Sequence, residues 1–146
     1  MTNQTYDSEF HEEFWCNFAK YLTEFRSSLK PHDKSSLKGL DEENPNTIVY
    51  ISNNNLELVA QIWPKSGRMA AKIILDEEIH RSYFKDHKTI EKKFSDRSKL
   101  KWHKSPLYSV GVYECDIDFS DVPKHEKLFE WLHRKLDKLE NTFARR

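Results

Sequence analysis

The apolar residues of this chain change their spacing several times, and these changes limit the possible folds more than any other feature. Over 8–30 they recur in steps of three and four, the period of one face of an amphipathic helix. The same period returns over 76–94 and over 120–143. Between these segments lie short runs that are β-branched or that alternate apolar with polar residues, as strands do. The expected strands are 47–51, 56–63, 69–75, 98–104 and 108–119.

This order of elements predicts the fold class. We expect an α+β fold, with an about five-stranded, largely antiparallel sheet and three helices in the order α-β-β-β-α-β-β-α. The first two strands flank a short polar turn and are expected to form a hairpin. The connection through the central helix leaves one parallel strand pair open as an alternative, with a right-handed crossover. Residues 31–46 are rich in turn-forming residues and are expected to form a loop.

Length and composition indicate one domain. The 146 residues contain no repeat or linker, so we expect a single α+β domain over 1–146 with its core at about 9–144. The 9 Phe, 6 Tyr and 4 Trp provide large apolar side chains for that core. The polar N-terminus does not resemble a signal peptide, no apolar run approaches the roughly 18 residues of a membrane helix, and the two cysteines lie far apart. We therefore expect a reduced, cytoplasmic protein without membrane contact.

A set of landmark residues extends over about 9–144. It comprises Phe14-Trp15, Tyr21-Leu22, Gly67-Arg68, Tyr83-Phe84, Ile90-Glu91 with Phe94, Leu100-x-Trp102, and Trp131-Leu132 followed by Leu136, Leu139 and Phe143. In this pattern the chain resembles a bacterial and archaeal family catalogued as domain of unknown function 4268. Members of that family occur alone or attached to nuclease-like and restriction-associated regions, so the resemblance implies an association with DNA restriction or defence. The matching positions are mainly apolar, which implies shared packing and carries over no catalytic residue.

The sequence contains no motif that predicts catalysis. His80 and His87 are seven residues apart, whereas a helical metal-binding pair is four apart, and the other histidines are no better placed. The expected strand 69–75 has Lys72 but carries Ala70 where a restriction-type nuclease has its acid. Neither a nucleophile elbow nor a phosphate-binding loop is present. We therefore predict no catalytic residue, no metal site and no cofactor; an enzyme with an unrecognised site is a third alternative.

Charge is balanced overall, with 24 basic and 24 acidic residues, but it is distributed unevenly. Residues 1–57 contain 10 acidic and 5 basic side chains, whereas 77–105 contain 9 basic and 5 acidic ones. In the second segment cations alternate with rings, as in a nucleic-acid platform. Tyr83, Phe84 and Phe94 nevertheless recur at helical spacing and Trp102 at strand spacing, which favours rings that face a core. The candidate nucleic-acid-binding residues are Arg81, Lys85, Lys88, Lys92, Lys93, Arg97, Lys99, Lys101 and Lys104.

These observations predict a non-catalytic accessory or protein-interaction domain, with a protein partner or a homodimer as its assembly. Tyr and Trp anchor many protein interfaces, and Tyr50 and Trp63 are the candidate interaction residues because they lie near strand ends and a turn. The alternative is a domain that binds DNA or RNA through the basic surface of residues 81–104. A contiguous basic face would favour nucleic acid, and an exposed aromatic patch would favour a protein partner.

Overall fold

The computed structural model describes residues 8–25, 29–31, 46–52, 56–94, 99–104 and 108–143. Within these ranges, six strands form one sheet and four α-helices pack around it. The helices are α1 (Ser8–Glu24), α2 (Glu77–Phe84), α3 (His87–Phe94) and α4 (His125–Phe143). The strands are β1 (Lys30–Pro31), β2 (Thr47–Ile51), β3 (Glu57–Trp63), β4 (Arg68–Ile74), β5 (Lys101–His103) and β6 (Ser109–Glu114), and two short 3₁₀ turns are η2 (Pro64–Ser66) and η3 (Val122–Lys124).

The sheet has the strand order β1-β2-β3-β4-β6-β5, and every neighbouring pair is antiparallel. This arrangement confirms the predicted α+β class and the hairpin of β2 and β3. The alternative with a parallel pair is wrong, because β6 lies between β4 and β5 and runs antiparallel to both. Among the described residues the sheet has six strands, where about five are predicted, and there are four α-helices rather than three.

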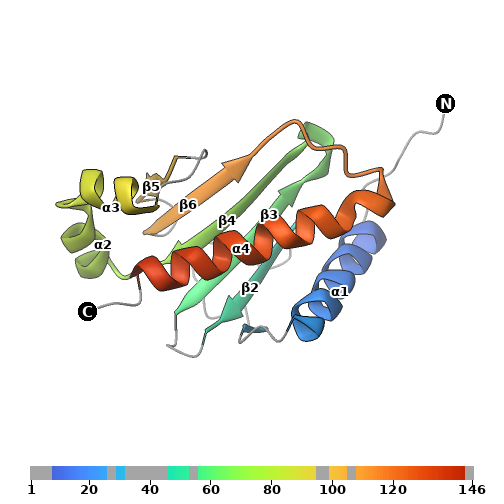
Figure 1. Cartoon of the computed structure of the whole chain (residues 1–146), viewed down its shortest axis with the longest axis horizontal. Coiled ribbons are helices and arrows are strands. Elements are labelled where there is room, and N and C mark those ends of the chain that lie inside the picture. Colours follow the sequence, from blue (N-terminus) through green and yellow to red (C-terminus); the bar gives the residue numbers. More distant parts are fainter. Residues whose placement is uncertain are drawn as a thin grey trace.

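The core lies between one face of the sheet and α4, which crosses that face diagonally (Figure 1). Helix α1 lies beside the N-terminal half of α4, and α2 and α3 lie near the opposite end of the molecule (Figure 1). Alternate residues of β3 point into the core, as predicted from Leu58, Ala60 and Ile62. They meet the apolar stripe of α4, including Leu132 and Leu136, both fully buried. The intervening residues of β3 point to the opposite face of the sheet.

The first helix ends earlier than predicted, at Glu24 rather than near residue 30. Lys30 and Pro31 instead pair with Ile51 and Tyr50 as the two-residue strand β1. At these two residues the structure is set by pairing with β2, although the spacing of the apolar residues predicts a helix. Proline is tolerated at this position because β1 is an edge strand, where a missing N–H group breaks no ladder.

The predicted central helix over 76–94 is two helices, α2 and α3, separated by Lys85 and Asp86. No glycine or proline marks this break in the sequence. At the break, the main-chain N–H of Asp86 donates to the carbonyl of Tyr83, and His87 Nδ1 lies 2.8 Å from the carbonyl oxygen of Phe84. The imidazole thus bonds to a carbonyl oxygen that would accept a main-chain N–H group in a continuous helix.

Candidate functional site

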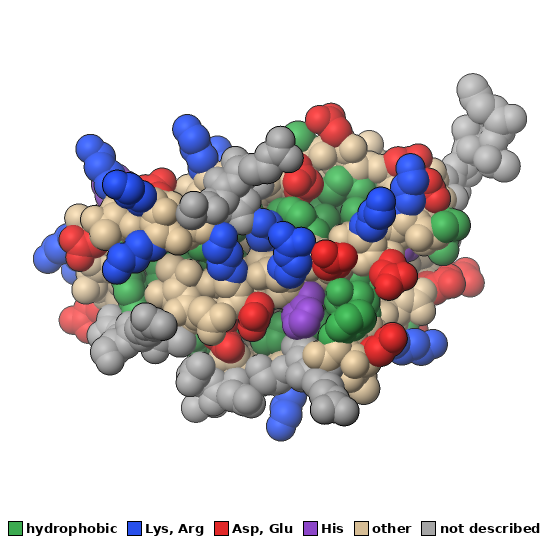
Figure 2. Space-filling view, viewed as in Figure 1, with side chains coloured by type: hydrophobic (Ala, Val, Ile, Leu, Met, Phe, Trp, Pro, Cys, Tyr) green, Lys and Arg blue, Asp and Glu red, His purple; other side chains and the backbone are tan. Residues whose placement is uncertain are grey.

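The structure places eight of the nine predicted nucleic-acid-binding cations; Arg97 lies outside the described residues. All eight are exposed, on α2 and the residue after it, on α3 and around β5. In the space-filling view, Lys and Arg predominate over the end of the molecule that contains α2 and α3, whereas Asp and Glu are more frequent toward α1 (Figure 2). The uneven charge of the sequence is therefore also an uneven charge in space.

Three of these cations come together at a pocket of about 200 Å³. Arg81 reaches it from α2, Lys85 from the residue that follows this helix, and Lys104 from the residue after β5. We call this the α2 pocket; its lining residues are His80, Arg81, Phe84, Lys85, Lys104 and Tyr108. No carboxylate occurs among these lining residues, so the described wall of the pocket combines aromatic rings with positive charge.

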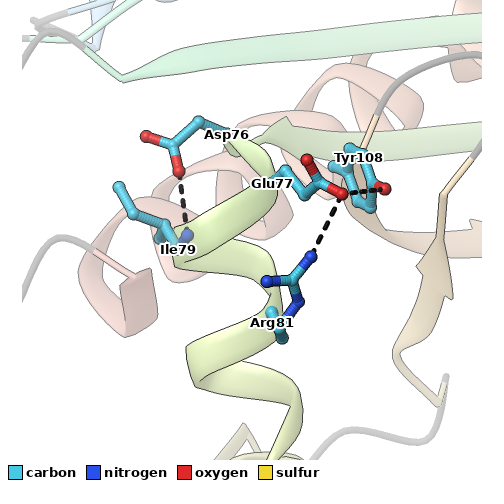
Figure 3. A network of polar contacts seen from close by, with 5 residues as sticks. All are labelled: Asp76, Glu77, Ile79, Arg81 and Tyr108. Carbon is cyan, nitrogen blue, oxygen red and sulfur yellow. Dashed lines mark hydrogen bonds and ion pairs between the residues drawn. The ribbon is translucent and has the colours of Figure 1, made fainter.

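Helix α2 is held at the pocket by a polar network (Figure 3). Asp76 is its N-cap, and its side chain accepts a hydrogen bond of 2.8 Å from the N–H of Ile79. Glu77 accepts two further bonds, from Arg81 at 3.1 Å and from the hydroxyl of Tyr108 at 2.9 Å. The second bond joins the first turn of α2 to the residue before β6, and so fixes the helix relative to the sheet.

His80 is the buried residue of the pocket, with 2% of its surface exposed. Its ring contacts the rings of Trp102 and Tyr108 edge to face, and its Nε2 has no hydrogen-bond partner. Burial lowers the pKa of this imidazole below 6.5, the positive charge of Lys104 lowers it further, and a hydrogen bond with the main chain of Ser109 acts in the opposite direction. The net effect of this environment is to favour the neutral form of His80.

A second group of side chains lies on the sheet face opposite α4. Trp63 of β3 pairs with Arg68 of β4, and Tyr113 of β6 pairs with Ala70 of β4, between Arg68 and Lys72. The rings of Trp63 and Tyr113 are nearly parallel, with centroids 6.4 Å apart. We call this group the sheet-face cluster; its members are Trp63, Arg68, Lys72, His103 and Tyr113.

Both cations of the sheet-face cluster lie over both rings. The guanidinium carbon of Arg68 is 5.4 Å from the centroid of Trp63 and 5.8 Å from that of Tyr113. The ammonium of Lys72 is 5.8 Å and 5.4 Å from the same two centroids. These distances are within the range of cation–π attraction. On the far side of Tyr113, its hydroxyl oxygen lies 2.9 Å from His103 Nε2.

Local backbone features make room for this arrangement. Gly67, which precedes Arg68, has φ +66° and lies against the main chain of Ile117, so that a Cβ there would be 2.8 Å from the Ile117 carbonyl oxygen. Glycine is the residue that adopts this conformation without strain. Gly111, the partner of Lys72 in the register, leaves space for the stem of that side chain.

The sheet-face cluster has an excess of positive charge. The ion pairs found among the described residues join Arg81 to Glu77, Lys124 to Asp121 and Arg134 to Glu130, and none of them reaches Arg68 or Lys72. Burial lowers the pKa of Lys72, and the charge of Arg68 lowers it further. His103 also has a lowered pKa, first from burial and then from Lys72, Lys101 and His80. An anion would relieve this repulsion.

The structure corrects two expectations about single residues. Tyr50 is only 1% exposed and belongs to the core, so its ring is not available as an interaction residue, whereas Trp63 is partly exposed. Phe84 was expected in the core with Tyr83 and Phe94, but it is 38% exposed and lines the α2 pocket. Phe94 is buried as expected, and Trp102 packs against the core.

The sequence identified three of the six lining residues of the α2 pocket, Arg81, Lys85 and Lys104, but only Trp63 of the sheet-face cluster. His80 and Tyr108 line the pocket, and Arg68, Lys72, His103 and Tyr113 form most of the sheet-face cluster. One signal was available: Arg68 and Lys72 alternate with the apolar residues of β4, which places them on the sheet face away from the core. Which residues of β3 and β6 lie beside them depends on strand order and register.

The described residues contain no group of three or more His, Cys, Asp or Glu side chains that is placed to hold a metal ion. In the same part of the chain, no helix is long and apolar enough to cross a membrane.

Comparisons with known proteins add little to this description. No protein-family model matches the chain, so the resemblance to domain of unknown function 4268 stays a prediction. No curated protein matches it either. Among solved structures, a chain of the HopA1–SchA chaperone–effector complex is similar, with 13% identity, a TM-score of 0.43, and coverage of 92% of this chain and 99% of that one. A superposition at that score carries no argument about function.

Proposed function

We propose that this chain is a non-catalytic protein-interaction domain that binds an acidic segment of another protein through the sheet-face cluster. The observation that carries the proposal is the convergence of Arg68 and Lys72 over the rings of Trp63 and Tyr113, with no carboxylate paired to either cation among the described residues. The resemblance to a family with restriction-associated members supports an accessory role of this kind, beside DNA restriction or defence proteins.

The composition of the cluster suits a protein interface. Trp, Tyr and Arg are the residue types that contribute most often to interface hot spots, and here all three are in contact on one face. The partner is acidic in this proposal because the two cations repel each other and Lys101 adds positive charge nearby. A carboxylate placed against Arg68 forms a charge-assisted hydrogen bond, which is stronger than a bond between neutral groups.

The binding test uses a synthetic peptide rich in Asp and Glu and a single-stranded oligonucleotide of the same net charge, each titrated into the full chain by calorimetry. Arg68→Glu reverses one charge, and Lys72→Met removes the other while keeping the length of the side chain. Lys20→Glu is the matched control, since it makes the same charge change on the exposed face of α1. Thermal unfolding of each variant checks that it is folded.

We expect the peptide to bind, each cluster variant to weaken binding about tenfold or more, and the control to bind as the unmodified chain does. Higher salt should weaken all of these affinities, because the partly exposed charges are screened. The proposal is overturned if the peptide does not bind, or if Lys20→Glu reduces its affinity as much as Arg68→Glu does.

A second candidate function, binding of DNA or RNA through the basic surface of residues 81–104, is favoured by one observation. All the cations of this surface that the structure describes are exposed, and they lie on neighbouring elements at one end of the molecule. Reversal of Lys92 and Lys93 to Glu should then weaken retention of the oligonucleotide and reduce its salt dependence. Unchanged retention by this double variant at low salt argues against the second candidate.

A further inference from the structure

The α2 pocket differs from the sheet-face cluster in one respect that matters for its ligand: it is a concave site. An apolar cavity of about 150 Å³ is large enough for a benzene-sized ring. The pocket, at about 200 Å³, therefore has room for one flat ring, with the rest of a ligand at its mouth. The walls include the planar aromatic side chains of His80, Phe84 and Tyr108, against which such a ring can pack.

Three charged residues line the pocket together with these rings. Arg81, Lys85 and Lys104 are exposed, in contrast to the buried His80, and they come from two separate segments of the chain. Arg81 is already bonded to Glu77, but this ion pair is exposed on both sides, so it is weak and can open to a stronger anion. Lys85 and Lys104 have no such acidic partner in the described structure.

The unpartnered nitrogen of His80 adds a requirement for a hydrogen-bond donor. A buried polar atom without a partner is costly, and such atoms in a native structure need an explanation. Because the Ser109 main chain bonds one side of the imidazole, Nε2 is left as an acceptor. A ring that carries an N–H group would satisfy it, whereas a hydrocarbon ring would not.

We propose that the α2 pocket is a nucleotide-binding site, in which the base lies among His80, Phe84 and Tyr108 and donates a hydrogen bond to His80 Nε2, while the phosphate lies against Arg81, Lys85 and Lys104. The ligand is a free nucleoside monophosphate or one nucleotide of a single strand, since both offer the same base and phosphate. This site is separate from the sheet-face cluster and does not depend on an acidic protein partner.

The test compares binding of a whole nucleotide with binding of its two parts, the nucleoside and the sugar phosphate. Adenosine monophosphate, adenosine and ribose 5-phosphate are each titrated into the ¹⁵N-labelled full chain, with main-chain amide shifts near His80 and Tyr108 as the readout. We expect the monophosphate to bind more tightly than either part. The proposal is overturned if none of the three shifts these amides, or if ribose 5-phosphate binds as tightly as the monophosphate, because the site is then one for anions alone.

Variants separate the two halves of the site. Lys85→Ala and Lys104→Ala should each weaken monophosphate binding about tenfold and leave adenosine binding nearly unchanged, since each removes a charge-assisted contact to the phosphate. His80→Phe should weaken both ligands, because it removes the acceptor nitrogen and keeps the ring. Lys92→Ala, an exposed cation of α3 outside the pocket, is the matched control.

The cation variants keep the test decisive even if His80→Phe does not fold, because both side chains are exposed. Equal losses from Lys104→Ala and Lys92→Ala would overturn the site. A dinucleotide distinguishes the two sources: binding tighter than that of the monophosphate assigns the ligand to a strand, and weaker binding assigns it to a free nucleotide. Arg68→Glu should leave monophosphate binding unchanged, so this proposal and the proposed function can fail independently.

Discussion

Gly111 of β6 and Lys72 of β4 are direct partners in the antiparallel register, and a Cβ at Gly111 would lie 2.9 Å from Cγ of Lys72. The same added carbon would be 3.4 Å from Cε1 of Tyr113. The absence of a side chain at residue 111 therefore lets the stem of Lys72 extend along the sheet, with its ammonium over the rings of Trp63 and Tyr113.

Gly111→Val should disrupt this arrangement. The branched side chain forces the stem of Lys72 away from the sheet, and overpacking of this kind costs about 1–3 kcal/mol of the free energy of unfolding. Urea denaturation measures that loss. A double variant, Gly111→Val with Lys72→Ala, should recover part of it, because the obstructing stem is gone. Additive losses in the two variants would show that residues 111 and 72 do not contact each other.

The N-cap of α2 gives a second prediction. Asp76→Ala removes the acceptor for the N–H of Ile79 and should lower the free energy of unfolding by about 0.5–2 kcal/mol. Asp76→Asn keeps an acceptor oxygen and should lose much less. Because α2 carries three of the pocket's lining residues before Lys85, the alanine variant should also weaken ligand binding in the α2 pocket. Equal stability of the two variants would contradict the capping role.

Tyr50 gives a third prediction, based on its burial. The hydroxyl of this residue is buried without a hydrogen-bond partner, and burial raises the pKa of the phenol above its ordinary value. Tyr50→Phe removes the unsatisfied hydroxyl and keeps the ring that packs against Phe18, so stability should stay the same or rise by up to about 1 kcal/mol. Tyr50→Ala should cost about 3–5 kcal/mol. A clear loss in Tyr50→Phe would reveal a hydrogen bond at this hydroxyl.

The sequence predicts the elements better than it predicts the sites, for a physical reason. Alternation identifies the core-facing residues of β3, because a strand with one buried face repeats every two residues. The break after Phe84 has no such mark: it depends on Asp86 and on the bond of His87 to a main-chain carbonyl. Both sites join residues distant in sequence, such as Trp63 and Tyr113, and strand order brings these together.

The two histidines with lowered pKa values predict how stability depends on pH. Burial is the main cause for both His80 and His103, and nearby lysines, Lys104 for the first and Lys72 and Lys101 for the second, add to it. A histidine whose pKa is lower in the folded state binds more protons when the chain is unfolded. Its stabilising contribution is therefore complete above pH 6.5, the ordinary value, and is lost as the pH falls through 6.5 toward the folded-state pKa.

Urea denaturation at about pH 7.5 and about pH 5.5 should show lower stability at the acidic value. His80→Phe and His103→Gln should each reduce that difference, since each removes one titrating group, and their effects should add in the double variant apart from the mutual influence of the two imidazoles. A pH difference as large in the double variant as in the unmodified chain would show that other groups cause it.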